Sequence, residues 1–136
     1  MSKKRLLVDF DYDFTLIGIS SHNKDYRLSY EINKALNTNL SKKEDVDFTK
    51  KGDKIGFSMY FFQDEMYEKD IRLLSNKKNG RILIPEQKLV DYFLILYDFD
   101  FIEVKEILEK LKNINAILTV FQIEVSTLKS KECLLF

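Results

Sequence analysis

Cysteine, proline, histidine and tryptophan are scarce in this chain, and the scarcity excludes several classes of protein. The sequence holds one cysteine, Cys133, one proline, Pro85, one histidine, His22, and no tryptophan. A single cysteine cannot form an internal disulfide or a thiolate cluster for zinc. We therefore expect a reducing compartment. Separately, we expect neither a metal centre nor a cofactor.

Net charge and long apolar runs are also lacking. The 22 basic residues balance 22 acidic ones, and no segment concentrates lysine or arginine enough to favour a nucleic-acid partner. The longest unbroken apolar run, Tyr92 to Tyr97, is far shorter than the roughly 20 residues of a membrane-spanning helix. The N-terminal sequence "MSKKRLLVDFDYDF" begins with basic residues, but acidic residues follow too early for a signal peptide. The sequence thus predicts a cytoplasmic protein with no membrane partner.

Hydrophobic residues are abundant, and their spacing indicates one domain over residues 1–136. They make up 45% of the 136 residues, which is enough apolar surface to offset the chain entropy lost on folding. Two stretches look like copies of one unit: "DFTLIGIS", from Asp13, and "DYFLILYD", from Asp91, each read as a buried strand. Each is followed by a helical pattern and then by a second strand. The helical faces comprise Leu28, Ile32, Ala35 and Leu36 in the first copy, and Val104, Ile107, Leu108, Leu111 and Ile114 in the second.

This order predicts an α+β domain with the ferredoxin-like split βαβ architecture, a mostly antiparallel sheet with two helices on one face. The first half covers residues 13–63, the insertion and crossover 64–90, the second half 91–125 and the C-terminal tail 126–136. The first strand of each half should lie inside the sheet, apolar on both faces, and the second should lie at an edge. The insertion, with "MYEKDIRLLS" and "RILI", should add a hairpin or edge strands.

The sheet face opposite the helices needs a cover, because monomers rarely expose large apolar patches. Three covers are open at this point: the insertion, the apolar tail "CLLF", or a second protein molecule. A homodimer through the sheet face is the partner we expect, and a small-molecule ligand is left open. The possible interface residues are Phe57, Met59, Tyr60, Phe61 and Phe62.

The single proline predicts a turn. Pro85 fixes its own φ and pushes Ile84 toward an extended conformation, so the strand "RILI" should stop there. "PEQKLV" then suits one helical turn, with Glu86 near the positive end of its dipole. Asp91 would begin the central strand. A paired-carboxylate site formed by Glu86 and Asp91 is the alternative interpretation.

The same stretch carries a resemblance to a known family. Ile84, Pro85, Glu86, Val90, Asp91 and Tyr92 match, position by position, the signature for which the IPExxxVDY family is named. The segments "GISSH", "DYRLSYEINKAL", "LLSNK" and "LKSKE" also look like that family, so the likeness covers most of the chain. The family is a set of small Bacteroidota proteins without an established activity. The resemblance therefore implies a lineage, with Pro85, Glu86, Asp91 and Tyr92 as a possible site.

Two further resemblances are partial. Asp11, Asp13 and Thr15 follow the DxDxT order of haloacid-dehalogenase-like phosphatases, but those acids lie on a loop after a strand, whereas here the strand begins after Asp13. Bulky Phe14 also replaces the usual glycine, so we disfavour that interpretation. "ILEKLKNINAILTVFQIEV" is similar to the closing half of ACT regulatory domains, in which a small ligand often binds at a dimer interface.

The remaining candidates are a helix start and the chain end. Ser20, Ser21 and His22 precede the first helix, where serines are natural caps and free backbone donors can hold an anion. A Ser-His nucleophile pair is the alternative there. "CLLF" fits the prenylation pattern formally, but we expect an apolar tail that packs against the domain.

The sequence therefore predicts a non-enzymatic protein-interaction or ligand-sensing regulatory module. A small enzyme using Glu86 and Asp91, or the residues around His22, is the alternative hypothesis.

Overall fold

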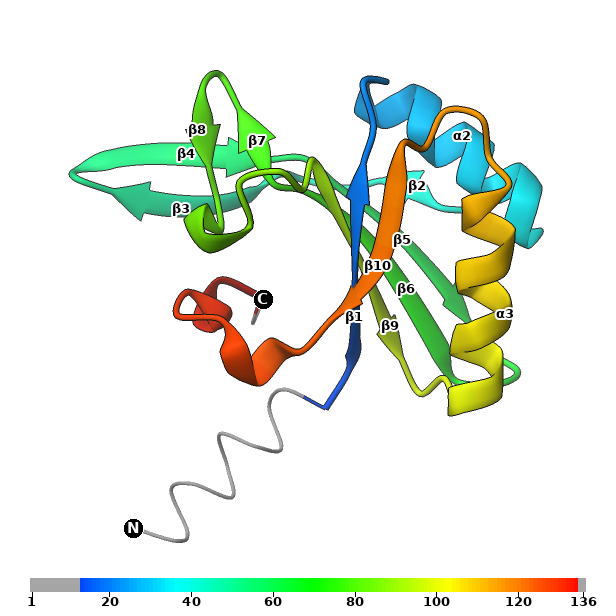
Figure 1. The fold of residues 1–136 in the computed structure, drawn as a ribbon. Helices are drawn as coiled ribbons and strands as arrows, with labels where there is room; N and C mark the ends of the chain where they lie inside the picture. The colour runs from blue at the N-terminus through cyan, green and yellow to red at the C-terminus, as the bar shows by residue number, and fades with distance from the viewer. Residues whose placement is uncertain (1–12, 135–136) are drawn as a thin grey trace, which may run out of the picture.

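The structure, a computed structural model, describes residues 13–134 and contains one main antiparallel sheet with two helices (Figure 1). In this part of the chain the main sheet has six strands, and every neighbouring pair is antiparallel. In order across the sheet, the strands are β10 (Thr119–Ile123), β1 (Thr15–Ser20), β9 (Tyr92–Tyr97), β6 (Lys69–Ser75), β5 (Met59–Asp64) and β2 (Ser41–Lys42). The predicted α+β class is confirmed.

The two predicted central strands, β1 and β9, lie side by side inside the sheet. The residues Leu16, Ile17 and Ile19 of β1 are fully buried, as are Phe93, Leu94 and Ile95 of β9. Because side chains alternate between the faces of a strand, consecutive buried residues mean that both faces are covered. The expectation that these strands are apolar on both faces is confirmed.

Both helices, α2 (Asp25–Leu36) and α3 (Phe101–Lys112), pack on the same face of the sheet (Figure 1). The start of α3 is fixed by a capping box, in which Asp100 accepts a hydrogen bond from the Glu103 backbone and the Glu103 side chain accepts one from the Asp100 backbone. The end of α2 is set by Asn37, which adopts the left-handed conformation at φ 56°.

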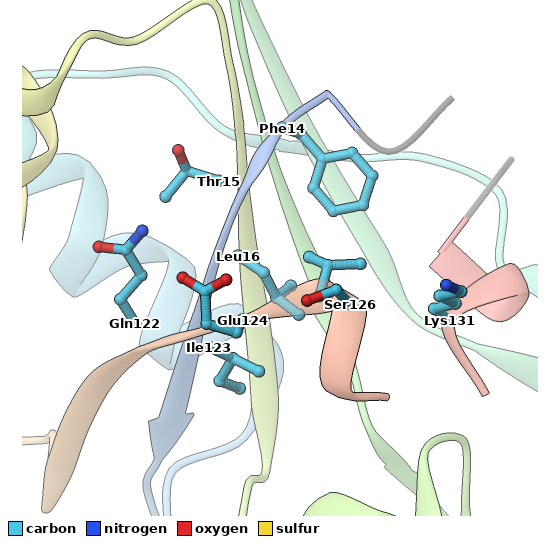
Figure 2. A pocket seen from close by; sticks show the side chains of 9 residues that line it. Phe14, Thr15, Leu16, Gln122, Ile123, Glu124, Ser126 and Lys131 are labelled. Carbon is cyan, nitrogen blue, oxygen red and sulfur yellow. The ribbon is translucent and has the colours of Figure 1, made fainter. Parts of the chain in front are cut away.

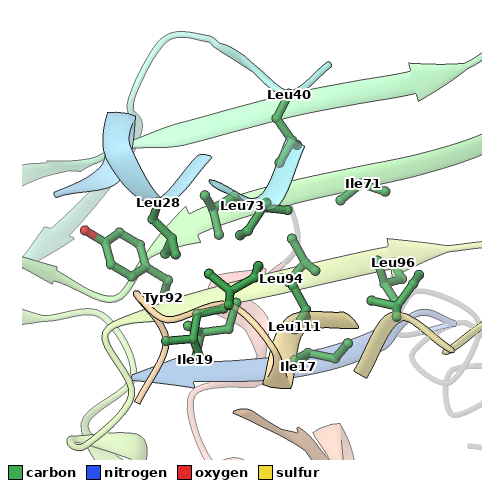
Figure 3. Close-up of a cluster of buried hydrophobic side chains, with 14 of the residues drawn as sticks. Ile17, Ile19, Leu28, Leu40, Ile71, Leu73, Tyr92, Leu94, Leu96 and Leu111 are labelled. Carbon is green, nitrogen blue, oxygen red and sulfur yellow. The ribbon is translucent and has the colours of Figure 1, made fainter. Parts of the chain in front are cut away.

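The core between helices and sheet is formed by the helical faces that the sequence predicts. Leu28 from α2 and Leu111 from α3 are fully buried, and they pack against Ile17, Ile19 and Leu94 of the central strands (Figure 3). Burial of one such side chain stabilises the fold by about 1.5–3 kcal/mol. This core fixes the helices against the sheet.

The predicted last strand of the first half differs in the structure. The strand expected at 57–63 is β5, but β5 is not next to β9: the strand beside β9 is β6, which we expected in the insertion. β6 suits an inner position because Ile71 and Leu73 face the helices while Leu74 is buried on the opposite face. The inserted chain therefore lies before β6, and β5 and β2 extend the sheet.

The face opposite the helices is covered by the chain itself. The cover consists of the hairpin β3 (Val46–Lys50) and β4 (Asp53–Phe57), the segment around Ile84 and Val90, and the tail as far as Leu134. Ile84 and Leu134 are fully buried. Of the three predicted covers, the insertion, through the segment around Ile84 and Val90, and the tail both contribute. The hairpin β3–β4 comes from the predicted first half and is a cover that we did not predict.

A short hairpin projects beyond the end of β6. It pairs β7 (Lys77–Lys78) with β8 (Arg81–Ile82). Its turn residues, Asn79 and Gly80, both have positive φ, at 48° and 80°. Asn-Gly is the favoured sequence for a two-residue hairpin turn of this kind, because both residues tolerate left-handed backbone.

Candidate functional site

The segment Ile84–Tyr92, here called the signature segment, connects the β7–β8 hairpin to the central strand β9. Ile84 is extended, and Pro85 begins a short 3₁₀ turn, Pro85–Gln87. The Gln87 backbone N–H donates to the Ile84 carbonyl at 3.0 Å, and the Val90 N–H donates to the Gln87 carbonyl at 3.0 Å. The predicted turn at Pro85 is confirmed, but the strand expected over "RILI" ends at Ile82, and β9 begins at Tyr92, one residue after Asp91.

One fully buried side chain, Asn76, binds the signature segment at both ends. Its Oδ1 accepts a hydrogen bond from the Ile84 N–H at 2.8 Å. Its Nδ2 donates to the carbonyls of Gln87, at 3.0 Å, and Val90, at 2.8 Å. An uncharged side chain with an acceptor and two donors is suited to this position, since buried backbone groups must be paired. Sequence reasoning missed Asn76, although it lies in the quoted segment "LLSNK".

Asp91 ties the signature segment to two other parts of the chain. One carboxylate oxygen accepts a hydrogen bond from the Ser21 backbone N–H at 2.8 Å, and the other lies 2.9 Å from the Lys77 Nζ. The Ser20 hydroxyl adds a bond to the Leu89 carbonyl at 2.6 Å. Both oxygens of Asp91 therefore hold the end of β1 and the hairpin beside the signature segment.

Glu86 holds the C-terminal tail. Its two carboxylate oxygens accept hydrogen bonds from the Ser130 backbone N–H, at 2.6 Å, and from the Ser130 hydroxyl, at 3.1 Å. Burial alone would raise the pKa of Glu86, but the hydrogen bonds from the Ser130 N–H and hydroxyl prevail and lower it. Glu86 therefore stays ionised at neutral pH and fixes the tail.

Tyr92 is buried at the start of β9, and its hydroxyl donates to the Asn23 carbonyl at 2.8 Å. Burial, together with the negative charges of Asp25 and Asp91, raises the pKa of Tyr92 to about 12. The phenol is thus neutral at physiological pH and acts as a hydrogen-bond donor. It joins the signature segment to the loop before α2.

The serines before α2 do not cap that helix, contrary to our expectation. The N-cap residue is Lys24, which makes no side-chain capping bond. The Ser21 hydroxyl donates to the Ala116 carbonyl at 2.6 Å and accepts from the Asn23 N–H at 3.1 Å. These bonds use the serine for tertiary contacts, because three residues separate it from the helix. His22 is exposed in the same loop.

The possible interface residues lie partly inside the domain. Phe57 is 0% exposed and Tyr60 is 7% exposed, while Met59, Phe61 and Phe62 are half-buried. Phe57 and Met59 pack in the cluster opposite the helices, and Tyr60 and Phe62 pack on the helical side. They are therefore divided between the two faces of the sheet.

Two other predicted segments reach beyond the described residues. Of the DxDxT pattern, Asp11 lies outside them, Asp13 is exposed and Thr15 begins β1. In "CLLF", Cys133 is half-buried and Leu134 is fully buried, whereas the last two residues lie outside the described range. The described part of the tail packs against the sheet as predicted.

A hollow of about 290 Å³ lies between the start of β1, the end of β10 and the tail (Figure 2). Its walls combine apolar Phe14 and Leu16 with polar Gln122, and Glu124 and Lys131 supply one charge of each sign. Such a mixed lining suits a small polar molecule. Among residues 13–134, no group of three or more metal-binding side chains converges, in this hollow or elsewhere.

Comparisons with protein-family models, curated proteins and solved structures give no match. Within the described part of the chain, no helix has the length and apolar character needed to cross a membrane.

Proposed function

We propose that this chain is a non-enzymatic protein-interaction module, cytoplasmic and related to the IPExxxVDY family. Its signature serves the fold: Glu86 binds Ser130, and Asp91 binds Ser21 and Lys77. Acids that are satisfied in this way have little freedom to exchange protons with a substrate, which weighs against the alternative of a small enzyme.

A ferredoxin-like core is part of this proposal, and strand directions support it. Since neighbouring strands are antiparallel, β6 runs parallel to β1 with β9 between them, and β10 runs parallel to β9 with β1 between them. Each pair is connected through a helix, α2 or α3. Two interlocked units of this kind define the split βαβ arrangement.

The observation that carries the proposed function is a group of exposed hydrophobic side chains at one end of the sheet. Met66 and Tyr67, in the β5–β6 turn, are 81% and 66% exposed; Phe101 and Ile102, at the start of α3, are 79% and 65% exposed. We call these four residues the end patch. Clustered exposed hydrophobic residues are typical of protein-binding surfaces.

Lys69 holds the two parts of the end patch together. Its Nζ donates to the Asp98 carbonyl and to the Glu103 carboxylate, each at 2.8 Å, and lies 4.8 Å from the centre of the Phe99 ring. The turn after β5 is thereby joined to the loop before α3. We place the interaction surface at this end, because pairing through the sheet face would require the hairpin β3–β4 and the tail to move away.

Site-specific photo-crosslinking in cells tests the proposal. A photoreactive phenylalanine derivative at Ile102 should give protein adducts, and the same group at Leu118, which is 58% exposed on the loop before β10, is the matched control. Adducts at Ile102 should disappear when Met66→Ser and Tyr67→Ser are added. Equal labelling at both positions, or none at either, would refute the proposed interaction surface.

The enzyme alternative has a separate test. In the double variant Glu86→Gln and Asp91→Asn, we expect the midpoint of thermal unfolding to fall by several degrees, because both acids hold distant segments. Unchanged or higher stability would favour a functional role for the acids.

A further inference from the structure

A basic hollow lies between the β7–β8 hairpin and the signature segment. It has a volume of about 520 Å³, and its lining contains four cations and no acid: Lys77, Lys78, Arg81 and Lys88. Ile82 and Leu89 supply apolar surface, and Leu89 is 78% exposed. We call this feature the basic hollow.

Two of the four cations form ion pairs within the described residues and two, Lys78 and Lys88, do not. Lys77 pairs with Asp91 at 2.9 Å, and Arg81 pairs with Asp53 at 2.8 Å. Lys78 and Lys88 form no ion pair with another residue of the range 13–134. An exposed leucine surrounded by cations suits a partner that presents an apolar side chain flanked by acids.

The chain carries a segment of that description in the β5–β6 turn. The segment Asp64–Glu68 reads "DEMYE", so three acids flank Met66 and Tyr67 of the end patch. The turn is preformed, since the Asp64 carboxylate accepts hydrogen bonds from the Met66 N–H at 3.2 Å and the Tyr67 N–H at 3.4 Å. We call this segment the acidic turn. A preformed turn loses little conformational entropy on binding.

The acidic turn cannot reach the basic hollow of its own molecule. The turn immediately precedes β6 and the hairpin follows it, so the seven residues of β6 separate them. At about 3.3 Å per residue, that separation is roughly 23 Å along a rigid inner strand. The hairpin and the turn lie at opposite ends of β6 (Figure 1). Contact between the two surfaces therefore requires a second molecule.

We infer that the acidic turn of one molecule docks into the basic hollow of another copy, so that molecules associate head to tail. This inference rests on the proposed function and names the partner. Met66 and Tyr67 would cover Leu89 and Ile82, while the carboxylates of Asp64, Glu65 and Glu68 approach Lys78 and Lys88. Because the acidic turn and the basic hollow lie at opposite ends of β6, molecules can join through one contact each, in a chain or ring, or through two reciprocal contacts in a two-fold dimer. In every case each contact joins the acidic turn of one molecule to the basic hollow of the other.

Sedimentation velocity of the purified full chain tests the inference. Wild-type protein should form dimers or larger species as its concentration rises. Raising the salt from 50 to 500 mM should weaken assembly about tenfold or more, since exposed charges are screened. A turn variant, Met66→Ser with Tyr67→Ser, and a hollow variant, Lys78→Glu with Lys88→Glu, should each be monomeric.

Mixing the two variants is the decisive measurement. The turn variant keeps an intact hollow and the hollow variant keeps an intact turn, so an equimolar mixture should give a 1:1 dimer and nothing larger. The charge-matched control, Lys105→Glu with Lys112→Glu on the exposed side of α3, should assemble like wild type. A misfolded variant could not restore a dimer, so the mixture also checks folding.

Three outcomes would overturn the inference: a monomeric wild type at low salt and high concentration, assembly that survives the hollow substitutions, or no dimer in a mixture of two variants that both have the circular-dichroism spectrum of the wild type. If the wild type is monomeric but Ile102 still gives adducts with other proteins, self-association is wrong and the proposed interaction surface stands. If those adducts also need Lys78 and Lys88, the occupant of the basic hollow is another protein. Absence of both assembly and adducts would refute both proposals.

Discussion

Replacement of Asn76 by alanine should destabilise the domain more than any other single polar substitution in the signature region. Asn76 and Ile84 are 0% exposed and Val90 is 1% exposed. The substitution removes the partners of the Ile84 N–H and the Val90 carbonyl, while the Gln87 carbonyl keeps its bond from the Val90 N–H. Each buried backbone group left unpaired costs about 1–3 kcal/mol.

Two such groups give an expected loss of about 4 kcal/mol in the free energy of unfolding. For a domain of this length, each kcal/mol lowers the midpoint of thermal unfolding by about 3–4 °C, so the midpoint should fall by about 12–16 °C. Circular dichroism measures the free energy during urea unfolding and the midpoint during heating. The control is Asn115→Ala, at an exposed position, which should change stability by less than about 0.5 kcal/mol.

Asn76→Asp separates hydrogen bonding from side-chain volume. The aspartate keeps an acceptor for the Ile84 N–H but turns its second oxygen toward the Val90 and Gln87 carbonyls, which need donors. Burial beside acceptors should raise the folded-state pKa of the new carboxyl above its unfolded value of about 3.9. Stability should then fall as pH rises from that value through the folded-state pKa. An alanine variant that loses under 1 kcal/mol, or an aspartate variant as stable as wild type at pH 7, would refute this account.

Three further predictions concern other contacts. The hydrogen bonds from Ser130 lower the pKa of Glu86, so the stability that they add should be complete above the usual glutamate pKa and lost as pH falls through the lowered pKa. Nuclear magnetic resonance of the Ser130 amide should show this titration in the wild type and not in Glu86→Gln. Gly18→Leu should lower stability by about 1–3 kcal/mol and Gly18→Ala by less, measured by urea unfolding, because even a Cβ there lies 2.8 Å from the Ile123 Cδ1. Burial, and secondarily the charge of Glu132, raises the pKa of the Cys133 thiol. Its reaction with an aromatic disulfide reagent at pH 7.5 should therefore be about tenfold or more faster in the unfolded chain than in the folded one, and equal rates would contradict the prediction.

The central strands and both helices were predictable because their signals are local. The apolar run from Tyr92 to Tyr97 and the helical spacing of Val104, Ile107 and Leu111 each lie within one element. The place of β6 in the sheet was not predictable in this way. Its Arg72 suggests an edge strand, yet the guanidinium lies over the rings of Tyr97, at 4.7 Å, and Phe61, at 5.5 Å. Aromatic faces accommodate the cation within an inner strand.

Within the candidate site, the sequence predicted the backbone turn but not the partners of the acidic side chains. Proline dictates the turn at Pro85 through its own φ and that of the preceding residue. The partners of the two acids come from distant parts of the chain: Ser130 is 44 residues from Glu86, and Ser21 is 70 residues from Asp91. Periodicity carries no information about such pairs, so a structural role and a catalytic role looked alike in the sequence.

The signature segment stabilises the fold and also lines the basic hollow, which is the proposed binding site for the acidic turn. Lys88 and Leu89 belong to the signature segment and form one wall of the hollow, while Lys77 of the opposite wall is bound to Asp91. Asp91→Asn should keep an acceptor for Ser21 but lose the ionic bond that sets the distance between the walls. Glu86→Gln, its matched control, disturbs only the tail.

We therefore expect Asp91→Asn to weaken head-to-tail assembly several-fold in sedimentation velocity, and Glu86→Gln to leave it unchanged. Both variants should remain folded, because each loses only part of a network that Asn76 still holds. Equal effects of the two substitutions would mean that the signature segment acts through the stability of the whole domain. A selective effect of Asp91→Asn would mean that the signature segment also serves assembly. The ion pair between Asp91 and Lys77 would then both stabilise the fold and hold the two walls of the basic hollow in place.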